Sequence, residues 1–464
     1  MKGRLAEVAA AVGGRLDGAD AAFAGVSTDS RTIEAGMLFV ALAGERFDGN
    51  AFLAAAAARG AAGAVVSESS EGGLPQVVVG DTQAALTALA AAWRARSDAV
   101  VLGVGGSNGK TTTKELLAAI LAGSGPTLAT RGNLNNHIGV PLTLLRLEPA
   151  HRHAVIEMGA NHPGEIAALA ALAQPAIALV TNAGDEHLEG FGDLAGVAGA
   201  EGELFAGLDA SGTAVINADD PFAAQWQAMT PRGARILRFG IEAPADVRAE
   251  GIAGRIESGA FITAFTLVIG GEKARVRLPL AGRHNVSNAL GAAAAAHAAG
   301  IALPAIVAGL ERMRPVSGRL QLKPGLRGSW LIDDSYNANP SSVRAGIDVL
   351  AALPGEHWLV LGEMAELGDE TVPSHAGIGD YARRAGITRL FALGAAARYA
   401  ADAFGARASW YADASELAAA LTASLESGVT LLVKGSRVNR LERVVERLAA
   451  PLPAKSLQVA GNGN

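Results

Sequence analysis

The strongest constraint on this chain is a glycine-rich stretch that begins at residue 103. A short apolar run, residues 99–104, leads into it, and apolar residues recur at helical spacing over residues 115–121. The order strand, glycine loop, helix is typical of loops that bind phosphate groups, because backbone N–H groups converge where no Cβ blocks the approach. The sequence therefore predicts a site for a nucleoside triphosphate.

The loop departs from the strict phosphate-loop pattern at Val104, where that pattern has glycine. A glycine-rich turn before a helix is in some proteins only a tight connection, but Gly-Lys-Thr-Thr at the start of this helix favours nucleotide binding. We expect Lys110 to reach the outer phosphates and the Thr111 hydroxyl to ligate Mg²⁺. The residues expected to hold the phosphates are Gly105, Gly106, Ser107, Asn108, Gly109, Lys110, Thr111 and Thr112.

Length and composition exclude several classes of protein. The chain has 464 residues, half of them hydrophobic, which is enough for about three domains with large cores. Its formal net charge of -6 argues against a general nucleic-acid binder, which normally presents a basic stripe. The absence of cysteine excludes thiol catalysis, thiolate metal sites and disulfides, and is consistent with a reducing compartment.

The sequence shows neither a secretion signal nor a membrane span. Residues 1–16 have the pattern of an amphipathic helix interrupted by Glu7, and they lack the unbroken apolar segment of a signal peptide. No window holds the roughly 18 uncharged apolar residues that a membrane-spanning helix needs. We expect a soluble, cytoplasmic protein.

Three units follow one another along the chain. Residues 1–95 have a small α/β pattern, and residues 96–313 alternate strands with helices, which predicts a parallel sheet with crossovers. Within the second unit, residues 246–277 have the pattern of an antiparallel insert. Residues 314–464 repeat the α/β alternation without a phosphate loop, and the last 14 or so residues have the composition of a frayed tail.

Polar residues lie where predicted strands end, which is where ligands bind in parallel sheets. Glu157 ends an apolar strand, and because a carboxylate there seldom faces a core, it is a candidate metal ligand. His187 follows another strand and, alone, is equally compatible with a ligand and a structural histidine. Residues 27–31, Ser-Thr-Asp-Ser-Arg, suit a diphosphate or a sugar, but a capped turn with a surface arginine explains them equally well.

Several segments in this order resemble the ATP-dependent Mur ligases of peptidoglycan synthesis. The likeness runs from about residue 27 to residue 443 and is weakest between about 221 and 280. Its segments are 103–112 (Gly-Val-Gly-Gly-Ser-Asn-Gly-Lys-Thr-Thr), 133–141, 282–285, 333–339 (Asp-Asp-Ser-Tyr-Asn-Ala-Asn), 362–368 (Gly-Glu-Met-Ala-Glu-Leu-Gly) and 434–437. Within this family, segments 333–339 and 362–368 resemble the branch that adds a dipeptide more than the branch that adds the third stem residue.

The resemblance implies three α/β domains. They are a small N-terminal domain for a UDP-muramoyl substrate, a central parallel-sheet ATPase with the phosphate loop, and a Rossmann-like C-terminal domain that closes over ATP and binds the dipeptide. The implied UDP-substrate residues are Ser27, Asp29, Ser30 and Arg31. The residues implied for adenine, ribose and phosphates are His284, Asn285, Arg319 and Asp334. Those implied for the peptide and dipeptide are Asn133, Asn135, Asn136, Tyr336, Asn337, Asn339, Lys434 and Ser436.

The resemblance also implies two Mg²⁺ ions. Thr111 and Glu157 match one site and His187 the second. The family usually has a carbamylated lysine 14 residues after this histidine, but here that position is Glu201, and no lysine occurs between Lys114 and Lys273. Our hypothesis is that Glu201 supplies the metal-binding carboxylate directly, without a CO₂ adduct. The alternative is a solvated helix glutamate.

The implied reaction joins D-alanyl-D-alanine to the tripeptide carboxylate of UDP-N-acetylmuramoyl-tripeptide through an acyl phosphate. An anion attacking a polyanion needs cations to neutralise the charge, which Lys110 and the two Mg²⁺ ions would supply. Lys110, and Glu157 and His187 as ligands of those ions, would therefore be catalytic. The sequence does not identify the base that deprotonates the amine; His375 is one candidate, and the acidic loop 363–370 either attracts the ammonium or is merely solvated. We expect a monomer.

Three alternatives stay open at this point. The first is a sister ligase that adds an earlier stem residue or extends folate with glutamate. The second is a regulatory nucleotide switch, against which residues 333–339 argue. The third, a nucleotide-binding module without turnover, fits poorly with a paired metal constellation.

Overall fold

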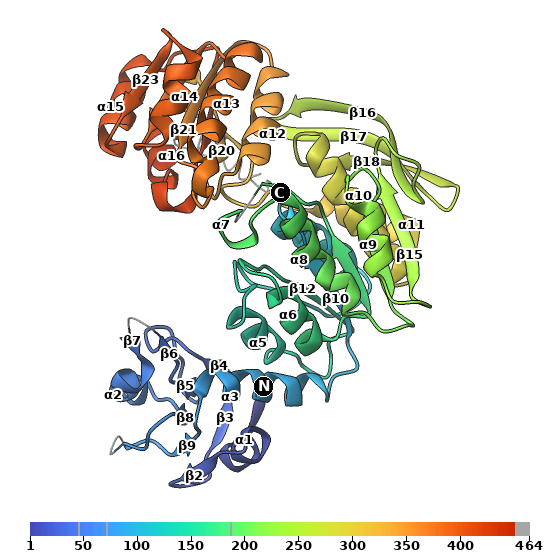
Figure 1. Ribbon diagram of the computed structural model, residues 1–464, viewed down its shortest axis with the longest axis vertical. Coiled ribbons are helices and arrows are strands. Elements are labelled where there is room, and N and C mark those ends of the chain that lie inside the picture. The colour runs from blue at the N-terminus through green and yellow to red at the C-terminus, as the bar shows by residue number, and fades with distance from the viewer. Residues whose placement is uncertain (45–46, 71–72, 186–187, 451–464) are drawn as a thin grey trace, which may run out of the picture.

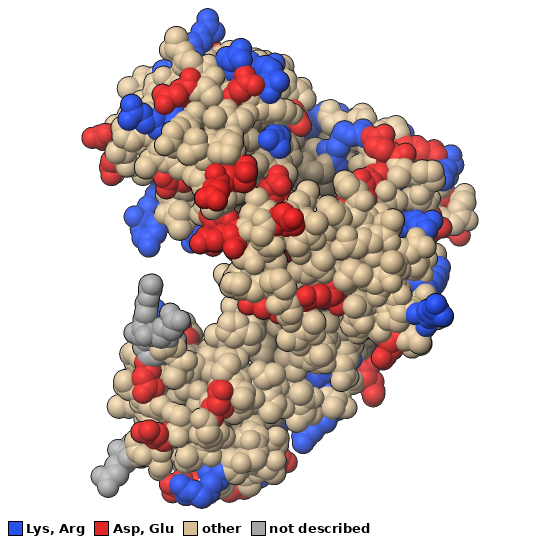
Figure 2. Space-filling view, in the orientation of Figure 1, with Lys and Arg blue, Asp and Glu red and all other residues tan. Residues whose placement is uncertain are grey.

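The structure is a computed structural model that describes residues 1–44, 47–70, 73–185 and 188–450. The chain folds into three α/β units that follow one another along the longest axis, with the N-terminal unit at one end and the C-terminal unit at the other (Figure 1). Figure 2 shows an open recess between the first and third units, with acidic side chains gathered on the wall nearer the third unit. No helix in the described ranges is long and apolar enough to cross a membrane.

The first unit is built on a five-stranded sheet with the order β2-β9-β8-β5-β4. Strand β2 is antiparallel to β9, and the other neighbours are parallel. Its elements are β1 (Lys2–Arg4), α1 (Leu5–Val12), β2 (Arg15–Asp17), β3 (Ala22–Ala24), β4 (Val26–Ser27), β5 (Leu38–Val40), β6 (Ala43–Gly44), β7 (Phe47–Asp48), η1 (Gly49–Phe52), α2 (Leu53–Ala58), β8 (Gly63–Val66), β9 (Gln76–Val78) and α3 (Thr82–Arg94).

Helix α3 joins the first unit to the second. Asp81 caps its N-terminus by accepting hydrogen bonds from the Gln83 and Ala84 N–H groups, and Leu86 and Leu89 are buried. The Trp93 indole N–H donates to the carbonyl of Leu147, 3.0 Å away in the second unit. One hydrophobic cluster contains buried residues of α1 and α3 together with buried residues of α5 (Gly139–Leu144), α6 (Glu165–Ala173) and α8 (Leu194–Ala206) in the second unit. The two units therefore share a core, and the predicted boundary near residue 95 stays a prediction.

The second unit has a nine-stranded sheet with the order β11-β12-β10-β13-β14-β15-β16-β17-β18. The pairs from β11 to β16 are parallel, whereas β16, β17 and β18 are antiparallel neighbours, so the predicted antiparallel insert is confirmed. Its elements are β10 (Val100–Gly105), α4 (Lys110–Leu121), β11 (Thr127–Ala129), α5 (Gly139–Leu144), β12 (His153–Glu157), α6 (Glu165–Ala173), β13 (Ile177–Val180), α7 (Leu188–Phe191), α8 (Leu194–Ala206), β14 (Thr213–Asn217), α9 (Ala223–Met229), β15 (Arg235–Gly240), β16 (Val247–Glu257), β17 (Ala260–Ile269), β18 (Glu272–Leu278), α10 (Arg283–Ala298) and α11 (Leu303–Arg312).

The parallel strands of this sheet are continuous apolar runs because helices cover both faces. Strands β12, β13 and β14 are buried along their whole length. Helix α10 is alanine-rich because it packs closely against α4 and the sheet, and small side chains allow that approach. This packing places the carboxyl ends of β10, β12 and β13 at one edge, next to the start of α4.

The third unit has a six-stranded sheet with the order β19-β20-β24-β21-β22-β23, parallel except for β19. Its elements are β19 (Gln321–Pro324), η2 (Leu326–Gly328), β20 (Trp330–Asp334), α12 (Pro340–Ala351), β21 (Glu356–Gly362), η3 (Gly368–Glu370), α13 (Thr371–Arg384), β22 (Arg389–Leu393), α14 (Ala397–Phe404), β23 (Ala408–Tyr411), α15 (Ala414–Ser424), β24 (Val429–Lys434), η4 (Arg437–Asn439) and α16 (Glu442–Leu448). The three-domain α/β architecture expected from the sequence is confirmed, and the predicted boundary near residue 313 stays a prediction. The predicted tail, residues 451–464, lies outside the described residues.

The hairpin β16–β17 reaches from the second unit to the third (Figure 1). Phe261, near its tip, is buried in the hydrophobic cluster of the third unit together with Ile332 and Val343. The hairpin therefore braces the third unit on the side opposite the open recess.

Candidate active site

The phosphate loop has the geometry that its glycines predict. Strand β10 ends at Gly105 and helix α4 begins at Lys110, with Gly109 as its N-cap at φ 84°. Gly106 also has a positive φ, 113°. A Cβ at Gly106 would collide with the Thr181 hydroxyl, and a Cβ at Gly109 would collide with the Asn288 side chain. Glycine is therefore required at both positions for backbone conformation and for space.

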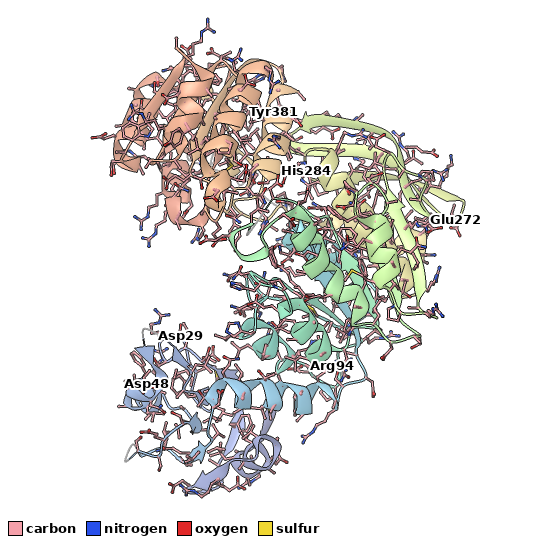
Figure 3. The ribbon with its side chains drawn as sticks, in the orientation of Figure 1. Asp29, Asp48, Arg94, Glu272, His284 and Tyr381 are labelled. Atoms are coloured by element: carbon pink, nitrogen blue, oxygen red, sulfur yellow. The ribbon has the colours of Figure 1, made fainter. Side chains whose placement is uncertain are left out.

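A cavity of about 920 Å³ lies between the second and third units, with the phosphate loop on its floor. A cavity of this size suits a nucleotide together with part of a second substrate. The predicted site residues among those lining it are Ser107, Asn108, Gly109, Lys110, Thr111, Thr112, Asn133, Asn135, Asn136, Glu157, His284, Asn285, Arg319, Asp334, Tyr336, Asn337, Asn339 and Lys434. Figure 3 places His284 where the two units meet.

Glu157 and Thr111 form the centre of the cavity floor. The Thr111 hydroxyl donates to Glu157 Oε1 at 3.2 Å, and Asn135 Nδ2 donates to the same oxygen at 2.9 Å. Glu157 is 2% exposed, and its Oε2 is buried without a hydrogen-bond partner among the described residues. A buried carboxylate oxygen without a donor is costly, so this oxygen and the adjacent hydroxyl fit a hard divalent cation.

Glu201 lies beneath the phosphate loop. It is on α8, 5% exposed, and its Oε2 accepts a hydrogen bond of 2.6 Å from the Gly106 N–H. The alternative of a solvated helix glutamate is therefore wrong. Direct contact of Glu201 with a metal stays a prediction. His187, predicted as its companion, lies outside the described residues, within which no group of three or more acidic or histidine side chains converges as a metal site.

Lys110 and Arg319 line the cavity from opposite units. Lys110 Nζ donates to the carbonyl of Ser107 at 3.0 Å. Arg319, from the third unit, donates from Nη2 to the Thr111 hydroxyl at 3.0 Å, and its guanidinium lies 4.5 Å from the centre of the Tyr336 ring. Thr111 therefore connects Arg319 to Glu157 across the boundary between the units.

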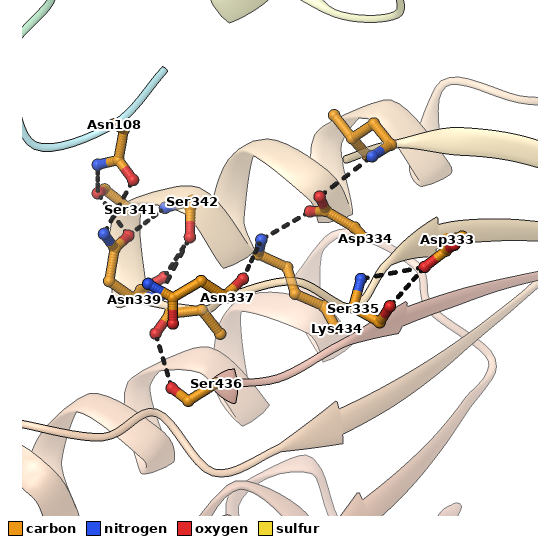
Figure 4. Close-up of polar contacts among 12 residues, drawn as sticks. Asn108, Asp333, Asp334, Ser335, Asn337, Asn339, Ser341, Ser342, Lys434 and Ser436 are labelled. Atoms are coloured by element: carbon orange, nitrogen blue, oxygen red, sulfur yellow. Dashed lines mark hydrogen bonds and ion pairs between the residues drawn. The ribbon is translucent and has the colours of Figure 1, made fainter. Parts of the chain in front are cut away.

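Asp334 and Lys434 pair at the carboxyl ends of β20 and β24. Lys434 Nζ lies 2.6 Å from Asp334 Oδ2 and also donates to the carbonyl of Asn337 at 3.0 Å (Figure 4). Burial raises the pKa of the Asp334 carboxyl, and the neighbouring Lys434 charge opposes that rise. Lys434 is 3% exposed and its charge is paired with Asp334. Its second contact, with the Asn337 carbonyl, holds the segment that follows Asp334.

That segment, residues 336–342, forms the wall of the cavity on the side of the third unit. Asn339 caps helix α12 by accepting from the Ser342 N–H at 2.9 Å. Ser436 lies behind the segment, where its hydroxyl donates to the carbonyl of Ala338 at 3.1 Å. Ser436 is not among the residues that line the cavity.

His284 and Asn285 begin α10 on the opposite wall. Burial, and to a lesser extent the nearby Lys434 charge, lowers the pKa of His284 to about 4, so the imidazole is neutral at neutral pH. Asn285 Nδ2 donates to the carbonyl of Ala281 at 2.7 Å. A neutral imidazole beside an amide suits a flat aromatic ring such as a nucleobase.

The predicted UDP-substrate residues are separate from the cavity. The Asp29 carboxylate accepts from the Arg31 Nε at 2.9 Å and from Nη2 at 2.8 Å, and the Asp29 N–H donates to the Ser27 hydroxyl. The guanidinium of Arg31 holds the pKa of Asp29 below its usual value. Figure 3 shows Asp29 in the first unit, far along the molecule from His284. The capped turn with a surface arginine is present, and the substrate role of Ser27, Asp29, Ser30 and Arg31 stays a prediction.

The sequence interpretation missed some residues and overvalued one. Ser341 and Asn288 line the cavity. Ser341 follows an Asn-Pro pair that signals a helix start, whereas Asn288 sits in an alanine-rich helix without a distinguishing pattern. His375 is fully buried, with Nδ1 2.7 Å from the carbonyl of Thr371 and Nε2 accepting from the Met364 N–H. Because His375 does not line the cavity, it is not placed to act as the base.

The chain matches three family models in succession. Residues 22–94 match the Mur ligase family catalytic domain, residues 104–296 the Mur ligase middle domain, and residues 318–437 the Mur ligase glutamate ligase domain.

Known proteins resemble the chain over nearly its whole length. The UDP-N-acetylmuramoyl-tripeptide–D-alanyl-D-alanine ligase of Escherichia coli K12 is 44% identical over 447 residues, which cover 96% of this chain and 98% of the relative. A crystal structure of MurF from Acinetobacter baumannii superposes with a TM-score of 0.89 at 35% identity, covering 96% of this chain and 98% of that one. MurF from Thermotoga maritima in complex with ADP has a TM-score of 0.81 at 27% identity, covering 91% and 96%. The chain belongs to the Mur ligase family.

Proposed function

We propose that this chain is an ATP-dependent ligase that joins D-alanyl-D-alanine to the tripeptide carboxylate of UDP-N-acetylmuramoyl-tripeptide, in peptidoglycan synthesis. The observation that carries the proposal is the chain of hydrogen bonds from Arg319 through Thr111 to Glu157, which joins the two units around one cavity. The name of the E. coli relative and the ADP bound to the T. maritima structure support the substrate and the nucleotide.

The chemistry requires activation because a carboxylate is a poor electrophile. An oxygen of the tripeptide carboxylate attacks the γ-phosphorus of ATP, the bond to the bridging oxygen breaks, and ADP leaves with those electrons. The product is an acyl phosphate. The neutral amine of the dipeptide then attacks the acyl carbon, phosphate leaves, and the amine proton passes to solvent or to a base. Lys110 and Arg319 supply positive charge to the phosphoryl group during the first step.

Magnesium is part of this proposal. Thr111 and Glu157 would hold one ion, and the fit rests on the unpartnered Oε2 of Glu157 beside the Thr111 hydroxyl. The ion would neutralise charge on the phosphates. Glu201 is proposed, with His187, for a second ion, because its carboxylate already reaches the phosphate loop without any adduct.

The remaining assignments follow from position on the cavity wall. Tyr336, Asn337 and Asn339 are proposed to face the dipeptide. Asn133, Asn135 and Asn136 are proposed to face the tripeptide, because all three line the cavity and Asn135 donates to Glu157. The UDP group is proposed to bind the first unit near Arg31. A monomeric state and a cytoplasmic location stay predictions.

The test is phosphate release from ATP with each amino acceptor in turn, in the presence of UDP-N-acetylmuramoyl-tripeptide. We expect release that depends on D-alanyl-D-alanine and is at least 100-fold slower with D-alanine, L-glutamate or diaminopimelate as acceptor. Equal release with a single amino acid would identify a sister ligase. Turnover that needs no acceptor at all would instead support a regulatory nucleotide switch.

The proposed metal role of Glu201 is tested by Glu201→Gln, which keeps the size of the side chain and removes its charge. We expect weaker Mg²⁺ binding to the ADP-bound protein by titration calorimetry, and a wild-type rate that does not change when bicarbonate is removed. An unchanged Mg²⁺ affinity in the variant would contradict the metal role and leave Glu201 only as a support for Gly106.

A further inference from the structure

Asn108 lies in the middle of the phosphate loop, and the two residues that follow strand β13 hold its backbone. Its N–H donates to Asn182 Oδ1 at 3.2 Å, and its carbonyl accepts from the Thr181 hydroxyl at 2.6 Å and from Asn182 Nδ2 at 2.9 Å. The main chain of Asn108 is therefore held in place by the second unit itself.

The side chain of Asn108 makes its hydrogen bonds to the third unit (Figure 4). Its Oδ1 accepts from Asn339 Nδ2 at 2.8 Å, and its Nδ2 donates to the Ser341 hydroxyl at 3.0 Å. Asn339 is the N-cap of α12, and Ser341 lies in the first turn of that helix. The contact uses one donor and one acceptor of a single group, so neither alanine nor aspartate can reproduce it.

The partner segment is rigid, so the contact is transmitted along it. The Ser341 hydroxyl donates to Asn339 Oδ1 at 3.1 Å, which closes a small network with Asn108. Lys434 holds the carbonyl of Asn337, and Ser436 holds that of Ala338. Residues 337–341 are therefore held together as one segment of the third unit, and Asn108 contacts that segment at Asn339 and Ser341.

The two units approach closely at this point. A Cβ added at Gly184 would lie 2.8 Å from Asn108 Nδ2 and 3.2 Å from the Ser341 hydroxyl. The contact has no room for an additional side chain. The hydrogen bonds of Asn108 therefore form only while the third unit lies against the loop.

From these contacts we infer that Asn108 is a positioning residue that holds segment 336–342 at a set place over the phosphate loop. Its side chain connects the nucleotide site with the acceptor site and contributes to the dipeptide step through Asn339. The inference rests on the proposed function for the identity of the acceptor, but not for the contact between the units.

The test is a double-mutant cycle with Asn108→Ala, Ser341→Ala and the double variant. We expect kcat/KM for D-alanyl-D-alanine to fall about 10-fold in each single variant, mostly through KM. The double variant should be no worse than the poorer single one, because both remove the same interaction. The affinity for MgADP, measured by calorimetry without dipeptide, should change less than 3-fold in Ser341→Ala, which leaves the phosphate loop intact. Ser342→Ala weakens the cap of the same helix without touching Asn108, and it therefore reports the effect of a weaker cap alone.

Two results would overturn the inference. One is a double variant whose loss equals the product of the single losses, since the two residues would then act independently. The other is a kcat/KM for D-alanyl-D-alanine that stays at the wild-type value in Ser341→Ala while it falls in Asn108→Ala, since the loss would then come from the loop itself and not from its contact with Ser341.

A second readout separates this inference from the proposed function. In the ADP-bound protein, amide hydrogen exchange over residues 339–345 should be faster in Asn108→Ala than in the wild type, whatever the acceptor is. If the wild type fails to use D-alanyl-D-alanine while this change is present, the proposed function is wrong and the positioning contact stands. Unchanged exchange would contradict the contact itself.

Discussion

At the scale of single residues, the floor of the cavity combines a satisfied and an unsatisfied oxygen on one side chain. Glu157 Oε1 accepts two hydrogen bonds, whereas Oε2 is buried without a partner among the described residues. A buried acceptor without a donor lowers the free energy of unfolding by about 1–3 kcal/mol, and other interactions in the fold must offset this cost. Such a group is expected where a ligand completes the site.

Glu157→Gln tests that interpretation. The neutral amide binds a divalent cation poorly, so we expect kcat/KM to fall at least 100-fold and the increase of Tm caused by Mg²⁺ with ADP to disappear. Without metal, the variant should be as stable as the wild type or more stable, because a buried charge is removed. Glu165→Gln is the matched control: Glu165 lines the same cavity but accepts from the Asn161 N–H at 2.7 Å. Retention of the Mg²⁺ effect in Glu157→Gln would exclude this carboxylate as a ligand.

His284 makes the free energy of unfolding depend on pH. Its pKa of about 4 in the folded protein lies below the roughly 6.5 of an unfolded histidine. Between these values the unfolded chain binds the proton more readily, so this contribution to stability is lost as pH falls from about 6.5 to about 4. The difference in unfolding free energy between the wild type and His284→Gln should shift by on the order of 2–3 kcal/mol across that window. Urea titrations at four pH values measure it, with His297→Gln on the same helix as control. A difference that stays constant with pH would show that His284 is not the titrating group.

The site residues at the ends of strands and helices were predictable from the sequence, whereas contacts between distant segments were not. Glu157, Lys110 and Thr111 were identifiable because they end a strand or begin a helix beside glycines. The contact of Asn108 with Ser341 was not, because the two residues are 233 positions apart and meet only through the placement of the third unit. The burial of His375 was equally hidden, since its position depends on how α13 packs under residues 363–370.

At the scale of elements, the hairpin β16–β17 adds a contact between the second and third units outside the cavity. Its strands pair in an antiparallel register with an irregularity between Glu250 and Ala253, which changes the direction of the outer half. The alternating pattern predicted antiparallel strands here. The sequence pattern did not show that the hairpin extends to the third unit, because the residues that bury Phe261 belong to the core of that unit.

Phe261→Ala is expected to destabilise the attachment of the third unit. Phe261 is 7% exposed, whereas its cross-strand partner Ile256 is 37% exposed. Truncation of a buried phenylalanine costs about 3–5 kcal/mol, so the variant should lower the Tm and loosen the third unit in hydrogen exchange. Ile256→Ala, the matched control on the same hairpin, should cost less than about 1 kcal/mol. Equal effects of the two substitutions would show that the hairpin tip does not brace the third unit.

At the scale of the whole molecule, the first and second units share one hydrophobic core. Helix α3 contributes Leu86 and Leu89 to a cluster that also contains Leu144 and Ile166 of the second unit. The strands of each sheet were predictable from their apolar runs. The common core of the two units was not predictable from the sequence, because Trp93 contacts Leu147 only once both units have folded.

Leu86→Ala should therefore weaken both sheets together. We expect the free energy of opening, measured by native-state hydrogen exchange, to fall by about 2–4 kcal/mol in β5 and β12 alike. The third sheet should change little. Leu421→Ala, a fully buried leucine of α15, is the reciprocal control and should lower protection only in the third unit. A loss confined to β5 after Leu86→Ala would show that the first two units open separately.

The common core of the first two units has a consequence for the choice of substrate. If the sugar nucleotide binds the first unit and the phosphoryl donor the second, as proposed, the shared core would hold the distance between the two sites constant. A constant distance would select substrates by stem length, because a stem of three residues would place its terminal carboxylate at the donor and a shorter stem would not reach it.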